Sequence, residues 1–404
     1  MDAADLSTRV STVRKTAADA GSSRRPSICV VAHRAYGAMT GGRSGHAGGV
    51  EHQTALTARW LATRGYDVQL VVWREGAGAE EEIDGVRVIK TCAEGAGAPG
   101  LRFFHPRWTT LEAALAAADA DLYYHNCAEY VTGQIAWWCQ RHQRRFVFSV
   151  ASDPECDPAL PLMQLRERVL YRYGLRRADA IIVQTRRQQQ MLREGFGLES
   201  TVLPMPCPAI DAAGPETPAP GPSPRIVWVG RMSPEKRLEM LAAVAAELPD
   251  VRFEVIGPAA DDAATAGALG QPGALANVVL RGRVPRDEMP AVYRGATALL
   301  CTSIYEGFPN TFLEAWGHGV PIVSTIDPDG LLTGHGLGFT AADASGLAAQ
   351  IRRLVESASL WQACSERSRE YCVAHHSVER ALPRFERVFL DALGTMGSLA
   401  GSRG

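Results

Sequence analysis

The chain has 404 residues, of which 46% are hydrophobic and 21% charged, and its formal net charge is −2 at pH 7. This length predicts about two domains, and the apolar content supplies a core and excludes disorder over most of the chain. A charge so close to zero gives no general basis for nucleic-acid binding. No run approaches the roughly 18 apolar residues of a membrane-spanning helix, so any membrane contact must be peripheral.

The cysteines and the first residues indicate a cytoplasmic protein. The nine cysteines are scattered and form no CxxC pair, which argues against a disulfide framework or a zinc knuckle and suits a reducing compartment. Residues 1–26 carry early acids and no apolar run of the kind found in signal peptides. We expect this segment to be a mobile lead-in.

From residue 27 to residue 203, short apolar runs alternate with amphipathic segments. Runs rich in β-branched and aromatic residues predict strands, and apolar residues three or four apart predict helices. Strand, helix and strand at this spacing predict a parallel sheet with helices on both faces. The predicted strands are 27–33, 67–73, 86–90, 121–126, 145–152 and 180–185, and the predicted helices include 51–65, 129–143 and 162–179.

Residues 204–224 hold eight of the chain's 24 prolines, a density that neither a helix nor a central strand tolerates. We interpret this segment as an interdomain linker, after which the alternation restarts over 225–377. The predicted strands there are 226–230, 251–257, 277–284, 297–303 and 320–325, with helices at 238–248, 286–296 and 310–319 and helices alone from 344 to about 393. The sequence therefore predicts two doubly wound α/β domains facing a cleft, with ligands at the carboxyl ends of the strands.

The last segment, 378–404, is predicted to be a helix and a tail. Pro383 suits the first turn of a helix, so we expect the helix to start near it. Apolar residues then recur three or four positions apart and form one stripe, Leu382, Phe385, Phe389 and Leu393. The alternatives are that this stripe crosses back to the first domain or that it caps its own domain.

The segment after the strand at 226–230 brings two cations close together. Ser233 can cap a helix that begins at Pro234, and the free N–H groups and dipole of such a helix attract anions. Arg231 and Lys236 flank this turn, and the pair suits a diphosphate. The chain has three lysines against 39 arginines, so a lysine at this position suggests a specific need. The alternative is a surface turn with solvated charges.

Two glutamates follow the strand predicted at 297–303 in the second domain. Glu306 lies in the loop after the strand, and Glu314 lies eight positions later in a helix that Asn310 can cap. Gly307 and Pro309 keep the loop tight and without large side chains, so its N–H groups can approach an anion. A carboxylate nearby suits the two hydroxyls of a ribose. The alternative is a solvated Glu314, although its apolar neighbours argue that it needs a partner.

Four segments, in this order along the chain, resemble motifs of one family: the retaining glycosyltransferases of family 4, or glycosyl transferases group 1, which have the GT-B fold. They are GGVEHQTALTARWLATRGYDVQLVV (48–72), DAIIVQTRRQQQMLREGFG (179–197), GRMSPEKR (230–237) and EGFPNTFLEAWGHGVPIVST (306–325). The resemblance implies a hexosyltransferase that uses a nucleotide-diphosphate sugar and a sugar or lipid-linked sugar acceptor in polysaccharide or glycoconjugate biosynthesis. It also places the last helix against the first domain.

The resemblance also implies roles for individual residues. Arg231 and Lys236 bind the donor diphosphate, Glu306 contacts the transferred sugar and Glu314 binds the ribose. The remaining expected donor contacts are Gly48 and Gly49 at the phosphates or sugar, Gly257, Arg283 and Val284 near the base, and Gly307, Phe308, Pro309 and Asn310 near the phosphates.

One position departs from the family. Many members carry a histidine at the end of the strand that corresponds to 145–152, where this chain continues into Asp153. We expect Asp153 or His125 to take the role of holding the donor sugar or the acceptor hydroxyl, although a lone histidine after a strand is more often structural. No cofactor or metal is expected, because the family uses Arg231 and Lys236 to neutralise the phosphates and the two DxD strings, 119–121 and 327–329, are not at family metal sites.

One rival enzyme class has the same architecture, the sugar-nucleotide epimerases and phosphorylases. Phosphorylases need a pyridoxal lysine, but the only lysine of the second domain is Lys236. A non-catalytic sugar-nucleotide-binding protein with a regulatory role is the second alternative, and the intact set of Arg231, Lys236, Glu306 and Glu314 argues against it.

A basic window in the first domain suggests contact with the inner face of the membrane. Residues 141–193 contain eleven arginines and five acids, a net charge of 11 − 5 = +6. Within it Leu162, Leu165, Val169 and Tyr173 recur at helical spacing, which suits an interfacial helix on anionic lipid. The alternative is a core-facing helix with a solvated arginine face.

Overall fold

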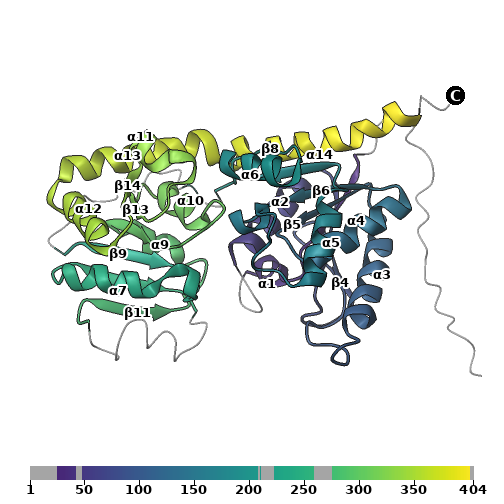
Figure 1. The fold of residues 1–404 in the computed structure, drawn as a ribbon, viewed down its shortest axis with the longest axis horizontal. Coiled ribbons are helices and arrows are strands. Elements are labelled where there is room, and N and C mark those ends of the chain that lie inside the picture. The colour runs from purple at the N-terminus through teal and green to yellow at the C-terminus, as the bar shows by residue number, and fades with distance from the viewer. Residues whose placement is uncertain (1–24, 42–47, 208–209, 211–222, 259–274, 401–404) are drawn as a thin grey trace, which may run out of the picture.

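The computed structural model describes residues 25–41, 48–207, 210, 223–258 and 275–400, with side chains to 394. Two α/β domains lie side by side, and the last helix runs from the second across to the first (Figure 1). Two doubly wound domains with a helical C-terminal end are what the sequence predicts. Almost all of the predicted lead-in, 1–24, and most of the predicted linker, 208–209 and 211–222, lie outside the described residues.

The N-terminal domain is built on an eight-stranded sheet of order β3-β4-β2-β1-β5-β6-β7-β8, with β3–β4 as its antiparallel pair. Every residue of β1 and β5 is buried, as expected for strands covered on both faces. The strands are β1 (Ser27–Val31), β2 (Asp67–Val72), β3 (Glu80–Ile83), β4 (Val86–Lys90), β5 (Leu122–Asn126), β6 (Arg145–Ser149), β7 (Ala180–Val183) and β8 (Thr201–Val202). The helices are α1 (Tyr36–Met39), α2 (Gly49–Thr63), η1 (Phe103–Trp108), α3 (Thr109–Ala118), α4 (Tyr130–His142), η2 (Asp153–Cys156), α5 (Leu165–Leu175) and α6 (Arg186–Phe196).

The C-terminal domain has a six-stranded parallel sheet of order β11-β10-β9-β12-β13-β14. Its strands are β9 (Arg225–Val229), β10 (Arg252–Ile256), β11 (Val278–Gly282), β12 (Ala298–Cys301), β13 (Ile322–Ser324) and β14 (Gly338–Thr340). Its helices are η3 (Pro234–Lys236), α7 (Leu238–Glu247), α9 (Met289–Arg294), α10 (Asn310–Gly317), η4 (Pro328–Gly330), α11 (Leu331–His335), α12 (Ala344–Glu356), α13 (Ala358–His376) and α14 (Val378–Ala400). No helix within the described ranges is long and apolar enough to cross a bilayer.

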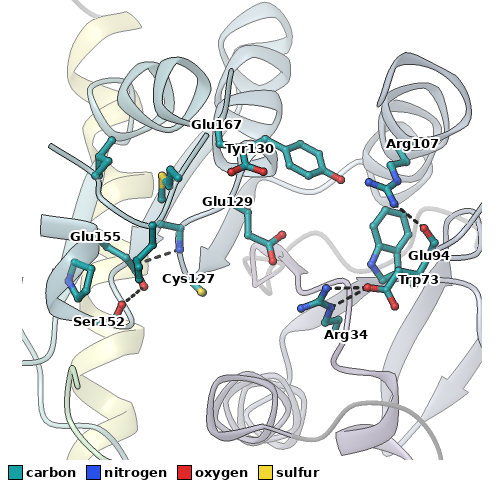
Figure 2. Close-up of a pocket in the computed structure, with 15 residues that line it drawn as sticks. Arg34, Trp73, Glu94, Arg107, Cys127, Glu129, Tyr130, Ser152, Glu155 and Glu167 are labelled. Carbon is teal, nitrogen blue, oxygen red and sulfur yellow. Dashed lines mark hydrogen bonds and ion pairs between the residues drawn. The ribbon is translucent and has the colours of Figure 1, made fainter. Parts of the chain in front are cut away.

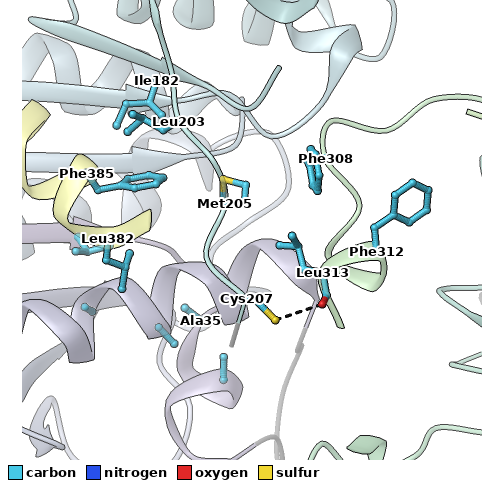
Figure 3. Packing of buried hydrophobic residues seen from close by; sticks show 14 of the residues in the cluster. Ala35, Ile182, Leu203, Met205, Cys207, Phe308, Phe312, Leu313, Leu382 and Phe385 are labelled. Carbon is cyan, nitrogen blue, oxygen red and sulfur yellow. Dashed lines mark hydrogen bonds between the residues drawn. The ribbon is translucent and has the colours of Figure 1, made fainter. Parts of the chain in front are cut away.

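One hydrophobic cluster extends from the first domain into the second (Figure 3). The chain crosses between the domains through it, because Met205 and Cys207, at the start of the predicted linker, are buried. The Cys207 N–H donates to the His376 carbonyl at 2.6 Å, and the Cys207 thiol lies 3.2 Å from the Leu313 carbonyl. The first residues of the linker are therefore a packed part of the domain junction.

The last helix, α14, packs on the N-terminal domain. The Tyr66 hydroxyl donates to the Glu386 carboxylate at 2.7 Å, and the Phe389 and Tyr124 rings lie 5.1 Å apart. The prediction that this helix starts near Pro383 is wrong: α14 begins at Val378, and Pro383 is its sixth residue. Pro383 cannot donate a hydrogen bond to the Glu379 carbonyl, but both residues lie on the exposed face, where water can reach that carbonyl, while the opposite stripe is buried against the first domain.

Candidate active site at the junction of the two domains

The loops after β9 and β10 approach each other very closely. A Cβ atom added at Gly257 would lie 1.8 Å from the Gly230 carbonyl oxygen, and Gly257 has a φ of 138°. Only glycine fits such a position, so Gly257 shapes the strand ends. Arg283 is exposed and Val284 half-buried just beyond β11, at the same edge of the sheet. These positions suit the predicted base pocket, and their contact with a base stays a prediction.

The turn after β9 differs from the sequence prediction. Ser233 and Pro234 open a short 3-10 turn, η3, and the α-helix begins only at Leu238. Arg237 separates the two, since its left-handed φ of 49° interrupts the helical path. The Ser233 hydroxyl donates to the Glu235 carboxylate at 2.5 Å instead of capping backbone N–H groups. Positive charge at this turn therefore comes from side chains rather than from a long helix.

Lys236 and Glu306 come together although 70 positions separate them in the sequence. The Lys236 ammonium forms an ion pair with the Glu306 carboxylate, which also accepts a 2.7 Å hydrogen bond from the Ser303 hydroxyl. Arg231 lies at the same turn with its side chain 72% exposed, 3.9 Å from the Glu235 carboxylate. Two cations and a sugar-binding carboxylate candidate therefore gather where the neighbouring strands β9 and β12 end.

The loop after β12 presses against the N-terminal domain. A Cβ atom at Gly307 would lie 2.2 Å from the Ala151 carbonyl oxygen and 2.4 Å from the Gln184 amide oxygen. That amide oxygen accepts a 2.5 Å hydrogen bond from the Phe308 N–H, and the Asp153 N–H reaches the Glu306 carbonyl at 3.3 Å. The ends of β6 and β7 therefore hold the loop that carries Glu306.

Asp153 lies at this junction, but its carboxylate faces its own domain. It accepts from the Gln188 side chain at 3.2 Å and pairs with Arg187 at 3.2 Å. Burial raises the pKa of the Asp153 carboxyl above its ordinary value. The alternative, His125, is buried beside Thr132, and burial lowers its pKa to about 3, so the ring is neutral. The packing of His125 fits a structural role, and the proposed role of Asp153 at a sugar stays a prediction.

Asn310 does not cap α10. Pro309 occupies the cap position, and Asn310 is the first helical residue. Its side-chain oxygen accepts a 2.6 Å hydrogen bond from Gln53 of α2. Gly49 lies against the same amide, with Gly48 capping α2 beside it. Gly49 thus meets the start of α10 across the domain junction, and Gly48 precedes it in the chain.

Glu314 has the partners that its apolar surroundings require. Its buried carboxylate pairs with Arg286 and accepts a 2.7 Å hydrogen bond from the Tyr293 hydroxyl. This excludes the solvated alternative. A small pocket adjoins the carboxylate, lined by Gly49, His52, Gln53, Arg286, Asn310 and Glu314. The sequence reasoning missed Arg286 and Tyr293, although Arg286 lies four residues after β11, where strand-end chemistry is expected.

Replacing Glu314 with glutamine tests this pocket. The substitution keeps the shape of the side chain but removes the charge that strengthens a hydrogen bond to a ribose hydroxyl by about 1 kcal/mol or more. We expect the donor KM to rise about five- to tenfold with little change in kcat. Steady-state kinetics check this, with Glu288→Gln, an exposed glutamate before α9, as the control. An unchanged donor KM would remove Glu314 from the donor site.

A cavity of about 360 Å³ opens in the N-terminal domain at the carboxyl ends of its strands (Figure 2). Arg34 pairs with Glu94 on one side at 2.8 Å, and Figure 2 shows the Glu129 carboxylate pointing toward Arg34. Burial raises the pKa of the Glu129 carboxyl. The lining residues are Arg34, Trp73, Glu94, Arg107, Cys127, Ala128, Glu129, Tyr130, Ser152, Pro154, Glu155, Leu160, Leu162, Met163 and Glu167.

Glu155 forms the wall that this cavity shares with the domain junction. Its carboxylate accepts hydrogen bonds from the Ala151 N–H at 3.0 Å, the Ala128 N–H at 3.1 Å and the Ser152 hydroxyl at 3.0 Å. The side chain is buried, and this burial raises its pKa from 4.5 to about 7 despite the three donors. The folded protein therefore keeps a proton that the unfolded chain loses above about pH 4.5.

Glu155 is expected to make the unfolding free energy of the protein fall as the pH rises from 4.5 to about 7. Because the folded state binds the Glu155 proton more tightly, the contribution of this group to the unfolding free energy declines from pH 4.5 to about 7, by about 3 kcal/mol. Urea unfolding at pH 5 and pH 8 measures this decline. Glu155→Gln, which has no titrating proton, should show a smaller decline between the two values. An equal decline in both proteins would contradict the assignment.

The two DxD strings have structural partners. Asp119 pairs with Arg144, and Asp121 accepts from the Ser27 hydroxyl at 2.9 Å. Asp329 accepts the Arg186 N–H at 2.7 Å at the start of α6, which adds another contact between the domains. No group of three histidines, cysteines or acids that could hold a metal occurs in the part of the chain that the structure describes. Metal independence stays a prediction.

The family models match both domains. One described as Glycosyl transferases group 1 matches residues 223–357, and one described as a Glycosyl transferase 4-like domain matches residues 48–208. The chain belongs to the group 1 glycosyltransferases. The first match contains Lys236, Glu306 and Glu314, and the second contains Gly48, Gly49 and all the residues that line the cavity except Arg34. The resemblance of the sequence motifs to the glycosyl transferases group 1 is confirmed, and the retaining mechanism stays a prediction.

Curated relatives of this glycosyltransferase are distant. A 2-deoxystreptamine glucosyltransferase from Streptomyces kanamyceticus is 28% identical over 54% of this chain and 62% of the relative. A D-inositol 3-phosphate glycosyltransferase from Mycolicibacterium gilvum is 26% identical over 70% of each chain. A peptide N-acetylglucosaminyltransferase GtfA subunit from Streptococcus pneumoniae is matched over 33% of its length. The chain thus spans less than two thirds of two of these relatives.

Solved structures confirm the GT-B fold of the glycosyltransferase. A sucrose-phosphate synthase from Thermosynechococcus elongatus superimposes with a TM-score of 0.76 at 18% identity, covering 92% of this chain and all of that one. HepE from Anabaena, in complex with UDP and glucose, has a TM-score of 0.70 at 17% identity, over 90% and 99% of the two chains. At these identities the likeness concerns the fold alone.

Proposed function

We propose that this glycosyltransferase moves a hexose from a nucleotide-diphosphate sugar to a sugar or lipid-linked sugar with retention of the anomeric configuration. The observation that carries the proposal is the pairing of Lys236 with Glu306 at the ends of β9 and β12, in a loop held against the N-terminal domain. This arrangement puts a phosphate-binding cation beside a carboxylate suited to sugar hydroxyls. The names of the relatives, which describe glycosyl transfer to varied acceptors, support the same reaction class.

The donor lies along the C-terminal domain in this proposal. Arg231 and Lys236 neutralise the diphosphate, Glu314 holds the ribose, and Glu306 orients the transferred sugar. The base lies beyond β10 and β11, near Gly257 and between Arg283 and Val284. Uridine diphosphate is the first nucleotide to test, because the HepE structure contains UDP and a similar structure described as trehalose-6-phosphate from E. coli is bound with UDP-2-fluoro glucose.

The acceptor occupies the cavity of the N-terminal domain. Ser152, Pro154 and Glu155 line it, and the neighbouring Asp153 N–H touches the Glu306 carbonyl, so the cavity adjoins the sugar end of the donor site. The Glu129 carboxylate and the Trp73 and Tyr130 rings, which also line it, suit a hydroxyl-rich ring with an apolar face. A cavity of about 360 Å³ is large enough for a sugar-sized head group.

The transfer step then depends on stabilising the negative charge of the departing diphosphate more than on a protein side chain that acts as a base. The bond from the anomeric carbon to the diphosphate oxygen breaks, and the acceptor hydroxyl forms its new bond on the same face. A phosphate oxygen of the leaving group takes the hydroxyl proton. Arg231 and Lys236 stabilise the departing diphosphate, and the domain junction positions the acceptor. No metal or cofactor enters these steps, and the nine free cysteines suit a cytoplasmic enzyme.

A panel of sugar nucleotides tests the proposal. Thermal shift identifies the donor, since a ligand at 100 times its Kd stabilises the folded state by about 2.7 kcal/mol. The identified donor is then incubated with sugar acceptors, and release of nucleoside diphosphate is measured together with the anomeric configuration of the product by NMR. Acceptor-dependent release with retention supports the proposal. Tight binding without release would support the non-catalytic alternative, and an inverted product would overturn the retaining mechanism.

A further inference from the structure

Large apolar side chains are exposed in two segments beside the acceptor cavity. They lie in and just before η1, and in and just before α5, and their exposure ranges from 60% to 76%: Leu101, Phe104, Leu162, Leu165 and Val169. These five residues are called the apolar ridge below. The two segments meet where the Arg166 guanidinium lies 4.1 Å from the centre of the Phe103 ring. Exposed apolar groups gathered in this way mark an interaction surface.

The ridge is not the core-facing side of α5. That side packs on α4, where the two helices cross closely at Gly133 and Gly174 and bury Tyr171 and Leu175. The stripe of Leu162, Leu165 and Val169 points away from this contact. The sequence alternative of an ordinary helix with its apolar stripe in the core is therefore wrong for these three residues.

Positive charge surrounds the ridge. Arg166 and Arg172 in α5, and Arg176 at its C-terminal end, are exposed. Arg102, beside Leu101, is also exposed. Exposed leucines with arginines on their flanks are the composition of helices that lie in the plane of an anionic membrane surface. A second copy of this chain is the less favourable occupant, because the same positive faces would repel each other.

The ridge also borders the cavity, because Leu162 and Met163 line its wall. We propose that the apolar ridge and its arginines dock the enzyme on an anionic bilayer, with the head group of a lipid-linked acceptor entering the cavity from the membrane. A single ligand then covers both features: its sugar fills the polar cavity and its lipid chain stays in the bilayer beside Leu165. The inference rests on the proposed function and names the lipid-linked class of acceptor for it.

Vesicle co-sedimentation of the full chain tests the docking surface. At low salt we expect binding to vesicles of phosphatidylcholine with about 30% phosphatidylglycerol and little binding to phosphatidylcholine alone. Leu165→Glu/Val169→Glu should weaken the apparent affinity at least tenfold, and Arg172→Ser/Arg176→Ser should do the same. Val373→Glu, which changes an exposed apolar residue on a helix of the other domain, is the matched control and should bind like the wild type.

Further measurements on the same samples distinguish a failure of the docking proposal from a failure of the proposed function. Salt at roughly 0.5 M should release the protein, because the Debye length then falls to a few ångströms. Binding that survives this salt unchanged, or that is equal in the ridge variant and the wild type, overturns the docking proposal. The docking proposal is also overturned if sedimentation velocity shows that the wild type is a dimer and that Leu165→Glu is a monomer. Thermal shift with the donor reports the proposed function independently: vesicle binding without donor binding means that the function has failed and the surface has not.

Discussion

Replacing Lys236 with alanine is expected to lower turnover at least tenfold without unfolding the protein. A charge-assisted contact to a phosphate contributes about 1.5–3 kcal/mol, which corresponds to roughly 10- to 150-fold in rate. The substitution also leaves the Glu306 carboxylate without its ion-pair partner next to the incoming diphosphate. Arg231→Ala should act in the same direction, because this exposed guanidinium lies at the same turn. Rates of nucleoside diphosphate release at saturating donor measure both effects.

The combination of the two changes gives the sharper result. If both cations act on one diphosphate, Arg231→Ala/Lys236→Ala should retain less than about 1% of wild-type turnover. Arg353→Ala is the matched control, since it removes an arginine of the same domain from α12, where it bonds Gln350 and lies over Phe339. Circular dichroism of all variants checks folding. Wild-type turnover in the double variant would remove the β9 turn from the mechanism.

The sequence predicts most of this fold because its strands are buried on both faces. Continuous apolar runs of this kind, such as those of β1 and β5, give a strong signal. The strands that were missed are short or atypical. β3 is the acidic segment Glu80–Ile83 at the edge of the sheet, β8 has two residues, and β14 has three and begins with a glycine. Pairing with a neighbouring strand, rather than their own composition, makes these segments strands.

The site residues that lie in local motifs were predictable from the sequence. Lys236 and Glu306 each belong to such a motif, and the need of Glu314 for a partner follows from its apolar neighbours. The partners themselves were not predictable, because Arg286 and Tyr293 reach Glu314 from other elements of the fold. Gln53 and Gln184, which hold the domain junction, are ordinary polar residues in the sequence. Their role appears only when both domains are in place.

The expected start of a helix at Ser233 shows the opposite error. Serine followed by proline is a good local signal for a helix start, but the backbone of Arg237 turns left-handed and delays the α-helix to Leu238. The Arg237 guanidinium donates to the Thr302 carbonyl at 2.7 Å, and the Thr302 hydroxyl donates to the Lys236 carbonyl. The end of β12 thus organises the turn after β9. These contacts between distant segments set the start of the α-helix, against the local signal of Ser233 and Pro234.

Gly307→Ala is expected to be nearly inactive although it adds a single methyl group. The new Cβ atom would lie 2.2 Å from the Ala151 carbonyl oxygen and 2.4 Å from the Gln184 amide oxygen. The Gln184 side chain can rotate away, but the Ala151 carbonyl belongs to the backbone beyond β6 and cannot yield without moving the loop or the domain. Relieving the overlap therefore separates Glu306 from the acceptor cavity.

The consequence for rate is large because transfer depends on positioning. A misplacement of about 1 Å between reacting groups costs roughly 100-fold, so we expect kcat to fall by about that factor, while donor affinity changes less because Lys236 and Glu314 remain in their own domain. Gly334→Ala is the control, since no atom lies within 4 Å of its added Cβ. Adding Gln184→Ala to Gly307→Ala should not restore turnover, because the Ala151 carbonyl remains. Full activity in Gly307→Ala would mean that the contact between β6 and the Glu306 loop is absent from the reacting state.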